Sequence, residues 1–183
     1  MRYPQGTPYA YSVIKNEPGD AEKVQEIEIG AIIPGPGVDV FNPQTRGTYG
    51  YGVNPNVVTS LEYERTLSAS GPAKGELVRP SDGKRPRKIA WIQCVGSRGI
   101  QVGSVSYCSS ACCMFALKEA MVTRERFSED METTLFSMDM RTSGKDYELY
   151  LQRAINDYGV RLVRSRPHTV EPIIEAGTPT GTS

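Results

Sequence analysis

The chain lacks the features that would mark a nucleic-acid-binding or membrane-spanning protein. Its 21 basic and 21 acidic residues cancel to a formal net charge of zero, so neither nucleic acid nor an anionic membrane is expected as a partner. No apolar run approaches the roughly 20 residues that span a bilayer, and the first residues lack the apolar core of a signal peptide. We therefore expect a cytoplasmic protein without a membrane span.

Histidine is also scarce. His168 is the single histidine of the chain, and it follows Pro167 in a predicted loop, where a surface position is expected. Without a histidine near the cysteines, the sequence argues against a cysteine nucleophile that is activated by a histidine base.

A dinucleotide-binding fingerprint is missing as well. The stretch CVGSRGIQVG contains Gly96, Gly99 and Gly103, but not at the GxGxxG spacing that turns a chain tightly around a pyrophosphate. Asp139 and Arg141 follow the next predicted strand, and without the glycines they are expected to be ordinary polar residues. The sequence thus argues against NAD(P)H binding at this junction.

The second half of the chain alternates strand and helix patterns. Short apolar runs predict strands at 88–94, 132–140 and 160–166, the last continuing after Pro167, and amphipathic runs predict helices at 109–127 and 143–159. The β-α-β-α-β order predicts an α/β fold, a Rossmann-like parallel half-domain over about residues 88–175. Because the first run is apolar almost throughout, we expect that strand to be buried on both faces.

The first half predicts a β-hairpin and irregular arm followed by a short helix. Alternating residues at 23–33 would pair with 11–15, with a turn at 17–20 and a break at the PGPG of residues 34–37. Thr59 and Glu62 have the spacing of a capping box and predict a helix that extends to about Ser70. A brief strand is expected at 76–78.

The composition also suggests domain limits. Residues 39–58 are rich in Gly, Pro, Asn and Tyr, which predicts irregular chain lying against its own domain or a partner. We predict an arm of residues 1–87, a cysteine-bearing domain of 88–175 and a flexible tail of 176–183.

All four cysteines of the chain lie between Cys94 and Cys113. Cys94 ends the first strand of the predicted half-domain, whereas Cys108, Cys112 and Cys113 precede or open the next helix, where Cys108 and Cys112 could share a face. Ligands of open α/β sheets gather at the carboxyl ends of strands, so we expect the thiols to converge there. The helix N-terminus would favour thiolates and an anionic group.

Four cysteines in this pattern are compatible with several kinds of chemistry. They can hold tetrahedral zinc or an iron–sulfur cluster, and the C-x13-C-x3-C-C spacing favours the cluster because structural zinc sites use paired CxxC knuckles. Redox-active thiols or a disulfide, and thiols that only pack in a core, stay open as alternatives.

The stretch KIAWIQCVGSR…YCSSACCMFALKEA resembles the A-subunit of heterodisulfide reductase, which is the flavin and iron–sulfur component of electron-transfer complexes. The likeness extends over about residues 26–171 and corresponds to a middle portion of the family's thioredoxin-reductase-like module. It implies a [4Fe–4S] cluster whose ligands are, position by position, Cys94, Cys108, Cys112 and Cys113. Gly96, Ser97 and Arg98 would then lie beside the cluster.

The resemblance implies an electron relay between a flavin and other iron–sulfur centres, an oxidoreductase component without catalytic residues of its own. The implied partners are the other subunits of such a complex and a flavin-bearing segment or subunit. The family's flavin and ferredoxin motifs are not found in this sequence, so FAD is expected only if a partner or missing segments complete its site. The alternatives are a structural subunit with zinc or free thiols, and a thiol-disulfide redox protein.

Overall fold

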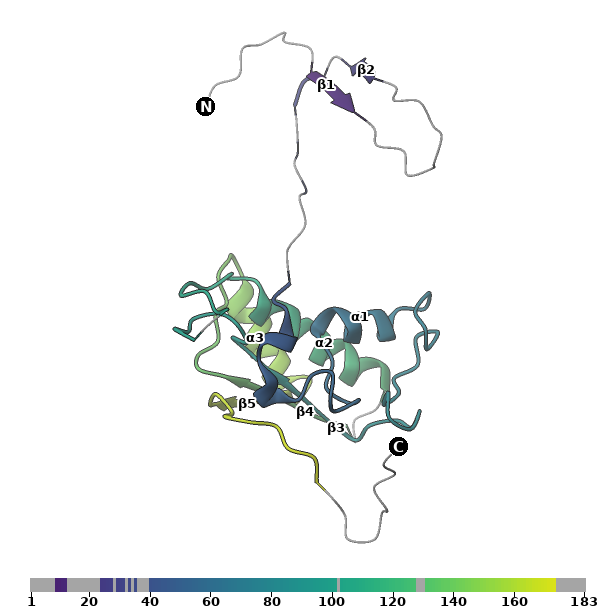
Figure 1. The fold of residues 1–183 in the computed structure, drawn as a ribbon, viewed down its shortest axis with the longest axis vertical. Coiled ribbons are helices and arrows are strands. Elements are labelled where there is room, and N and C mark those ends of the chain that lie inside the picture. Colours follow the sequence, from purple (N-terminus) through teal and green to yellow (C-terminus); the bar gives the residue numbers. More distant parts are fainter. Residues whose placement is uncertain are drawn as a thin grey trace. The chain divides into compact units, whose positions relative to one another are not determined.

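The computed structural model describes residues 9–12, 24–27, 29–31, 33, 35, 40–101, 103–127 and 131–173. Backbone contacts divide the chain into two units, Met1–Val40 and Phe41–Ser183. The first unit contains β1 (Tyr9–Ser12) and β2 (Val24–Ile27), which pair antiparallel with Tyr9 opposite Ile27 (Figure 1). This pairing confirms the predicted hairpin, while its predicted turn lies outside the described residues. The predicted limits of the arm, domain and tail stay predictions.

The second unit is built on a three-stranded parallel sheet in the order β3-β4-β5. Its strands are β3 (Lys88–Ile92), β4 (Glu132–Ser137) and β5 (Arg161–Arg164), connected by α2 (Cys112–Phe127) and α3 (Tyr147–Asn156). The predicted Rossmann-like β-α-β-α-β half-domain is thus confirmed. Within the described ranges, no helix is long and apolar enough to cross a membrane.

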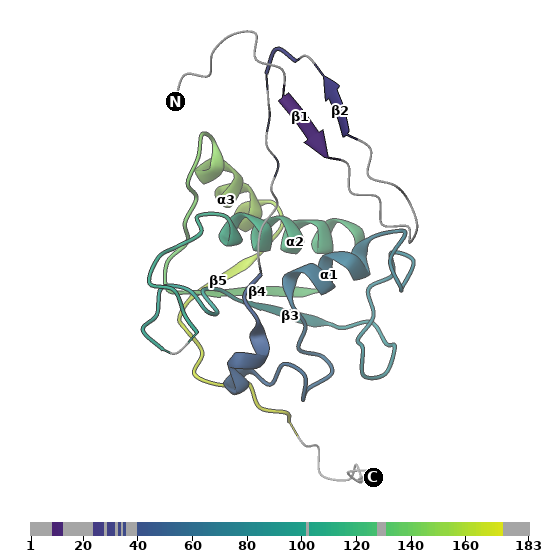
Figure 2. The same ribbon diagram turned by 45° about the horizontal axis from the view of Figure 1, so that its top comes forward.

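Both connecting helices and α1 (Ser60–Leu67) lie on the same face of the sheet (Figure 2). Right-handed connections between strands in sequential order place every connecting helix on one side. Trp91 and Leu135 on this face are buried, whereas Ala90 is exposed and Phe136 is half-buried. The prediction that the first strand is buried on both faces is therefore wrong.

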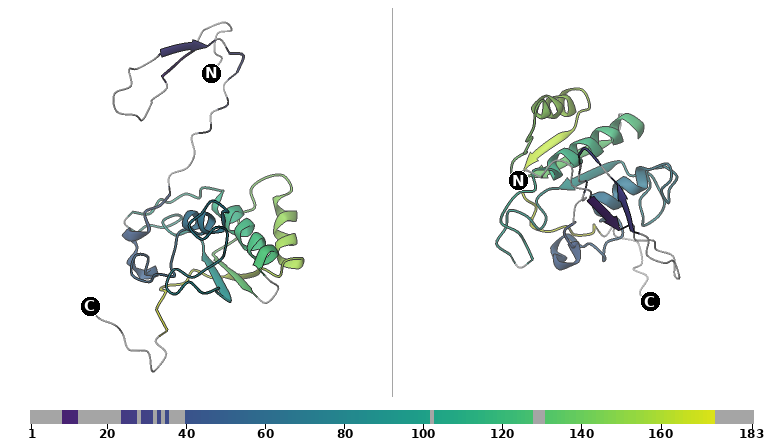
Figure 3. Two further views of the ribbon diagram at one scale, coloured as in Figure 1. Left: turned by 90° about the vertical axis from the view of Figure 1, so that its right-hand side faces the viewer. Right: turned by 90° about the horizontal axis from the view of Figure 1, so that it is seen from above.

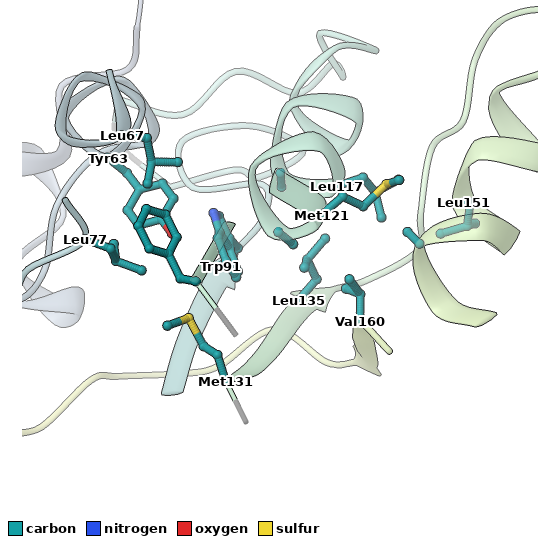
Figure 4. Close-up of a cluster of buried hydrophobic side chains, with 14 residues drawn as sticks. Tyr63, Leu67, Leu77, Trp91, Leu117, Met121, Met131, Leu135, Leu151 and Val160 are labelled. Carbon is teal, nitrogen blue, oxygen red and sulfur yellow. The ribbon is translucent and has the colours of Figure 1, made fainter. Parts of the chain in front are cut away.

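The core fills the space between α2 and the sheet (Figure 4). Leu117, Ala120 and Leu135 have no solvent exposure. Trp91 meets the ring of Tyr63 edge to face, with 5.5 Å between the ring centroids, so α1 is part of the same core. The amphipathic pattern that predicts this helix is confirmed, because one face of α2 is buried and consists of Cys113, Ala116, Leu117 and Ala120.

The capping box of α1 is present as predicted. The Glu62 N–H donates to Thr59 Oγ1 at 3.2 Å, and the Thr59 N–H donates to Glu62 Oε2 at 2.7 Å. Two predicted strands do not form. Neither residues 76–78 nor the described residues after Pro167 pair with a strand.

Residues 41–49 form two short 3-10 turns, η1 (Pro43–Thr45) and η2 (Gly47–Tyr49), on the side of the sheet opposite to α2 (Figure 2). The Val170 N–H donates to Thr48 O at 2.9 Å, and the Tyr49 hydroxyl donates to Pro167 O at 2.9 Å. These bonds, and not the pairing of a further strand, hold residues 167–170 against η2. The irregular segment therefore packs on its own domain.

Among the described residues of this unit, Glu119 has a buried carboxyl group. Glu119 of α2 is 7% exposed and accepts hydrogen bonds from the Ser60 hydroxyl and, at 2.7 Å, from Trp91 Nε1. It therefore joins α2 to α1 and β3. Burial raises the pKa of Glu119, although the two hydrogen bonds oppose the shift.

The raised pKa predicts how stability depends on pH. The folded state holds the Glu119 proton more tightly than the unfolded chain does. The protonated carboxyl therefore adds to the free energy of unfolding below the unfolded pKa, and this addition is lost as pH rises through the folded pKa. Glu119→Gln does not titrate; its amide oxygen can still accept from Trp91 Nε1, and its amide N–H can donate to the Ser60 hydroxyl, so both contacts are kept with the second bond reversed. Urea unfolding from pH 4 to pH 8 should show the wild type losing free energy of unfolding relative to this variant, and the exposed control Glu125→Gln should show no such trend. A constant difference between wild type and Glu119→Gln would contradict the prediction.

Candidate functional site

The four thiols lie at the carboxyl edge of the sheet. Cys94 follows the end of β3 by two residues, and Cys112 and Cys113 open α2. Cys108 lies in the loop between β3 and α2, which the right-hand view of Figure 3 shows beside the start of α2. All four are free, with Cys94 and Cys113 buried and the other two partly exposed. The structure thus places all four thiols at the edge of the sheet where the strand and helix pattern predicts them.

The helix begins three residues later than predicted. Ser110 has φ of 58°, in the left-handed region, and α2 starts only at Cys112. The prediction that Cys108 and Cys112 can share a helix face is therefore wrong, because Cys108 belongs to the loop. Cys94 and Arg98 also have positive φ, of 61° and 54°, so strained backbone gathers around the thiols.

Cys112 and Cys113 are paired by a hydrogen bond in which the Cys113 thiol donates. This bond lowers the pKa of Cys112 to about 6, with help from the Ser109 hydroxyl and the N–H groups of Cys112 and Cys113. The same bond and burial raise the pKa of Cys113, against a hydrogen bond from the Arg141 backbone. The start of α2 thus favours one thiolate, as expected where free helix N–H groups meet a sulfur.

The other two thiols have their own donors. Burial raises the pKa of Cys94, while Arg98, whose Nη1 lies 3.9 Å from the sulfur, acts in the opposite direction. The charges of Cys108 and Cys112 also act on Cys94, so thiols from all three segments lie within electrostatic reach. The Ser110 N–H donates to Cys108 Sγ at 3.3 Å.

The loop between Cys94 and Cys108 is held from within. The Val105 N–H donates to Gly96 O at 2.9 Å, and the Gly99 N–H donates to Val105 O at 3.3 Å. Ser97, predicted to lie beside a cofactor, forms a bridge with Val105. These bonds fold the loop back on itself and leave the side chain of Arg98 at Cys94.

The segment of η1 and η2 supports the loop from outside. Gly96 packs against the ring of Phe41, and its φ of 79° suits glycine. Arg46 donates from Nη2 to Ser104 Oγ at 2.5 Å. The segment of residues 41–49 therefore supports the loop between Cys94 and Cys108.

The sequence predicts ordinary polar residues at Asp139 and Arg141, but the structure links both to Arg98, beside Cys94. Asp139 forms an ion pair with Arg98 and accepts from Arg141 Nε at 2.9 Å. Their position in the sequence, directly after a predicted parallel strand, indicates this proximity, because residues that follow neighbouring parallel strands share one edge of the sheet with Cys94. His168 lies outside this group, after the end of β5.

The donor set fits an anionic group bound through sulfur. Each thiol has a hydrogen-bond donor at or near its sulfur, and these donors are backbone N–H groups, a hydroxyl and a guanidinium. Within the part of the chain that the structure describes, no three Cys, His, Asp or Glu side chains form a site for a single metal ion.

Known proteins provide an independent comparison. No protein-family model matches the chain. It is 49% identical over 145 residues to the second iron-sulfur A-subunit of the CoB–CoM heterodisulfide reductase of Methanopyrus kandleri, covering 79% of this chain and 22% of that relative. It is 44% identical over 142 residues to the A-subunit of the H(2):CoB-CoM heterodisulfide,ferredoxin reductase of Methanothermobacter thermautotrophicus, covering 78% of this chain and 21% of that relative.

The fold and the thiols define a Rossmann-like half-domain with a cysteine-rich ligand edge. Over the matched residues the chain belongs to the family of heterodisulfide reductase A-subunits, which confirms the resemblance. The chain spans about a fifth of the length of these curated relatives.

The contact between Gly96 and Phe41 makes a testable prediction. A Cβ at Gly96 would overlap the Phe41 ring, whereas at Gly83, which also has positive φ, it would meet open space. Gly96→Ala should cost about 2–4 kcal/mol of unfolding free energy, from backbone strain and overpacking, and Gly83→Ala only about 1 kcal/mol. Chemical unfolding measures both, and adding Phe41→Ala should recover part of the larger loss. Equal costs would contradict the role of Phe41.

Proposed function

We propose that this chain is an electron-transfer module that holds one [4Fe–4S] cluster through Cys94, Cys108, Cys112 and Cys113. The observation that carries the proposal is the gathering of four free thiols, each with a donor at or near its sulfur, at the carboxyl edge of the sheet. Two relatives are named iron-sulfur A-subunits of heterodisulfide reductase, which supports an iron–sulfur group here. The C-x13-C-x3-C-C spacing along the chain, which lacks paired CxxC knuckles, also favours a cluster over structural zinc.

The chain's own residues would hold and tune this group. When bound, such a cluster takes up and releases single electrons. Cys112 is already biased toward the thiolate that binding requires, and the start of α2 offers free N–H groups. Hydrogen bonds from Ser110 and from the Arg141 backbone would reach the sulfurs of Cys108 and Cys113 and favour the reduced state. Gly96 and Ser97 would shape the loop around it.

The wider setting is part of the same proposal. We place the module in the cytoplasm, in a complex of the heterodisulfide-reductase type, between a flavin and other iron–sulfur centres. A partner or further segments would supply the FAD site. The names of relatives as A-subunits of heterodisulfide and ferredoxin reductases support this assembly.

A thiol-disulfide redox protein is the second candidate, because Cys112 combines a pKa near 6 with partial exposure and a neighbouring thiol. A disulfide between Cys112 and Cys113 would have an unfavourable geometry, because the Cα atoms of adjacent residues are about 3.8 Å apart and disulfides prefer about 4.4–6.8 Å. The first proposal is therefore preferred.

Anaerobic purification with counts of iron, sulfide and zinc tests the function. We expect about four irons and four sulfides per chain and a broad visible absorption band. One zinc would support a structural subunit, and metal-free protein with a rapidly alkylated Cys112 would support the thiol-disulfide candidate. Either result overturns the cluster.

Single substitutions test the ligands. Each of the four Cys→Ala variants should lose most of its iron, because no spare cysteine exists in the chain. Met114→Leu, beside Cys113, is a matched control and should keep its iron. An intact four-iron cluster in Cys94→Ala would show that the ligand assignment is wrong.

A further inference from the structure

Three charged residues form a continuous network beside the buried thiol of Cys94. Arg98 Nη1 lies 3.9 Å from Cys94 Sγ and also forms an ion pair with Asp139. The other carboxylate oxygen of Asp139 accepts from Arg141 Nε at 2.9 Å. The loop that follows β3 is thus joined to the residues that follow β4.

Arg98 also reaches the third thiol segment. Its backbone N–H donates to Tyr107 O at 3.3 Å, immediately before Cys108. Its backbone adopts φ of 54°, and its side chain is only 20% exposed although arginine prefers solvent. The contacts with Cys94 and Asp139 and the partial burial of the side chain hold this guanidinium beside the Cys94 sulfur.

We propose that Arg98, held by Asp139 and Arg141, is a positioning and charge-setting residue of the thiol site that favours its more negative, reduced state. This inference rests on the proposed cluster. One-electron reduction by an external donor lowers the net charge of the site by one. The two arginines and one aspartate carry a net charge of plus one beside it, so they stabilise the reduced state relative to the oxidised state.

The network makes a prediction with two opposite signs. Arg98→Gln removes a positive charge and should lower the equilibrium constant for one-electron reduction. Asp139→Asn removes a negative charge while its amide oxygen can still accept from Arg98, so it should raise that constant. We expect changes of up to about tenfold, because the pair is partly exposed, and a tenfold change equals about 59 mV for a one-electron couple.

The experiment is an anaerobic titration with dithionite, in which electron paramagnetic resonance follows the reduced centre. Wild type, Arg98→Gln, Arg98→Lys and Asp139→Asn are compared at one ionic strength. Arg98→Lys keeps the charge and should recover most of the shift. Arg153→Gln and Asp157→Asn are matched controls, because this exposed pair on and just after α3 carries the same charges, and both should titrate as wild type.

Opposite shifts for Arg98→Gln and Asp139→Asn support the inference. Shifts in the same direction, or shifts no larger than those of the controls, overturn it while leaving the cluster in place. If Arg98→Gln fails to take up iron, Asp139→Asn decides alone, since a rise supports the inference and no rise overturns it. Iron-free wild type overturns the proposed function itself, which separates the two failures.

Discussion

The packing of α2 against a single face of the parallel sheet is the constraint on which the rest of the structure depends. Leu117 and Ala120 are completely buried against this face, so the helix can neither slide nor rotate without exposing apolar surface. A right-handed connection then brings the start of α2 to the carboxyl end of β3. Cys113 is held where the chain leaves the strand at Cys94, and the thiols meet as a consequence of the core.

Around that apolar base, polar groups carry the specific geometry. Glu119 ties α2 to α1 and β3 from inside the core, so the helix that presents two cysteines is held by hydrogen bonds as well as by burial. At the edge, Arg98 and Asp139 fix the loop from the solvent side. The backbone there is strained. Residues keep such unfavourable conformations only where the surrounding contacts hold them, and these conformations are common at functional sites.

Local signals predicted much of the fold. The capping box at Thr59 and Glu62 acts over three residues and forms as expected, and the inward face of α2 follows from helical periodicity. Features that depend on distant segments were not predictable. The helix pattern predicts a start of α2 that is three residues too early, because nothing local marks the left-handed conformation of Ser110. The strand predicted after Pro167 is replaced by hydrogen bonds to Thr48.

The sequence by itself determined the class of fold, the family and the position of four thiols at one strand–helix junction, because periodicity, spacing and motif are properties of the linear chain. Only the tertiary structure decided which face of the sheet is covered, which donors reach each sulfur, and that Arg98 meets Asp139 across the edge. Hydrogen bonds and ion pairs act over a few ångströms in space, and residues 41 positions apart come that close only after the sheet has formed.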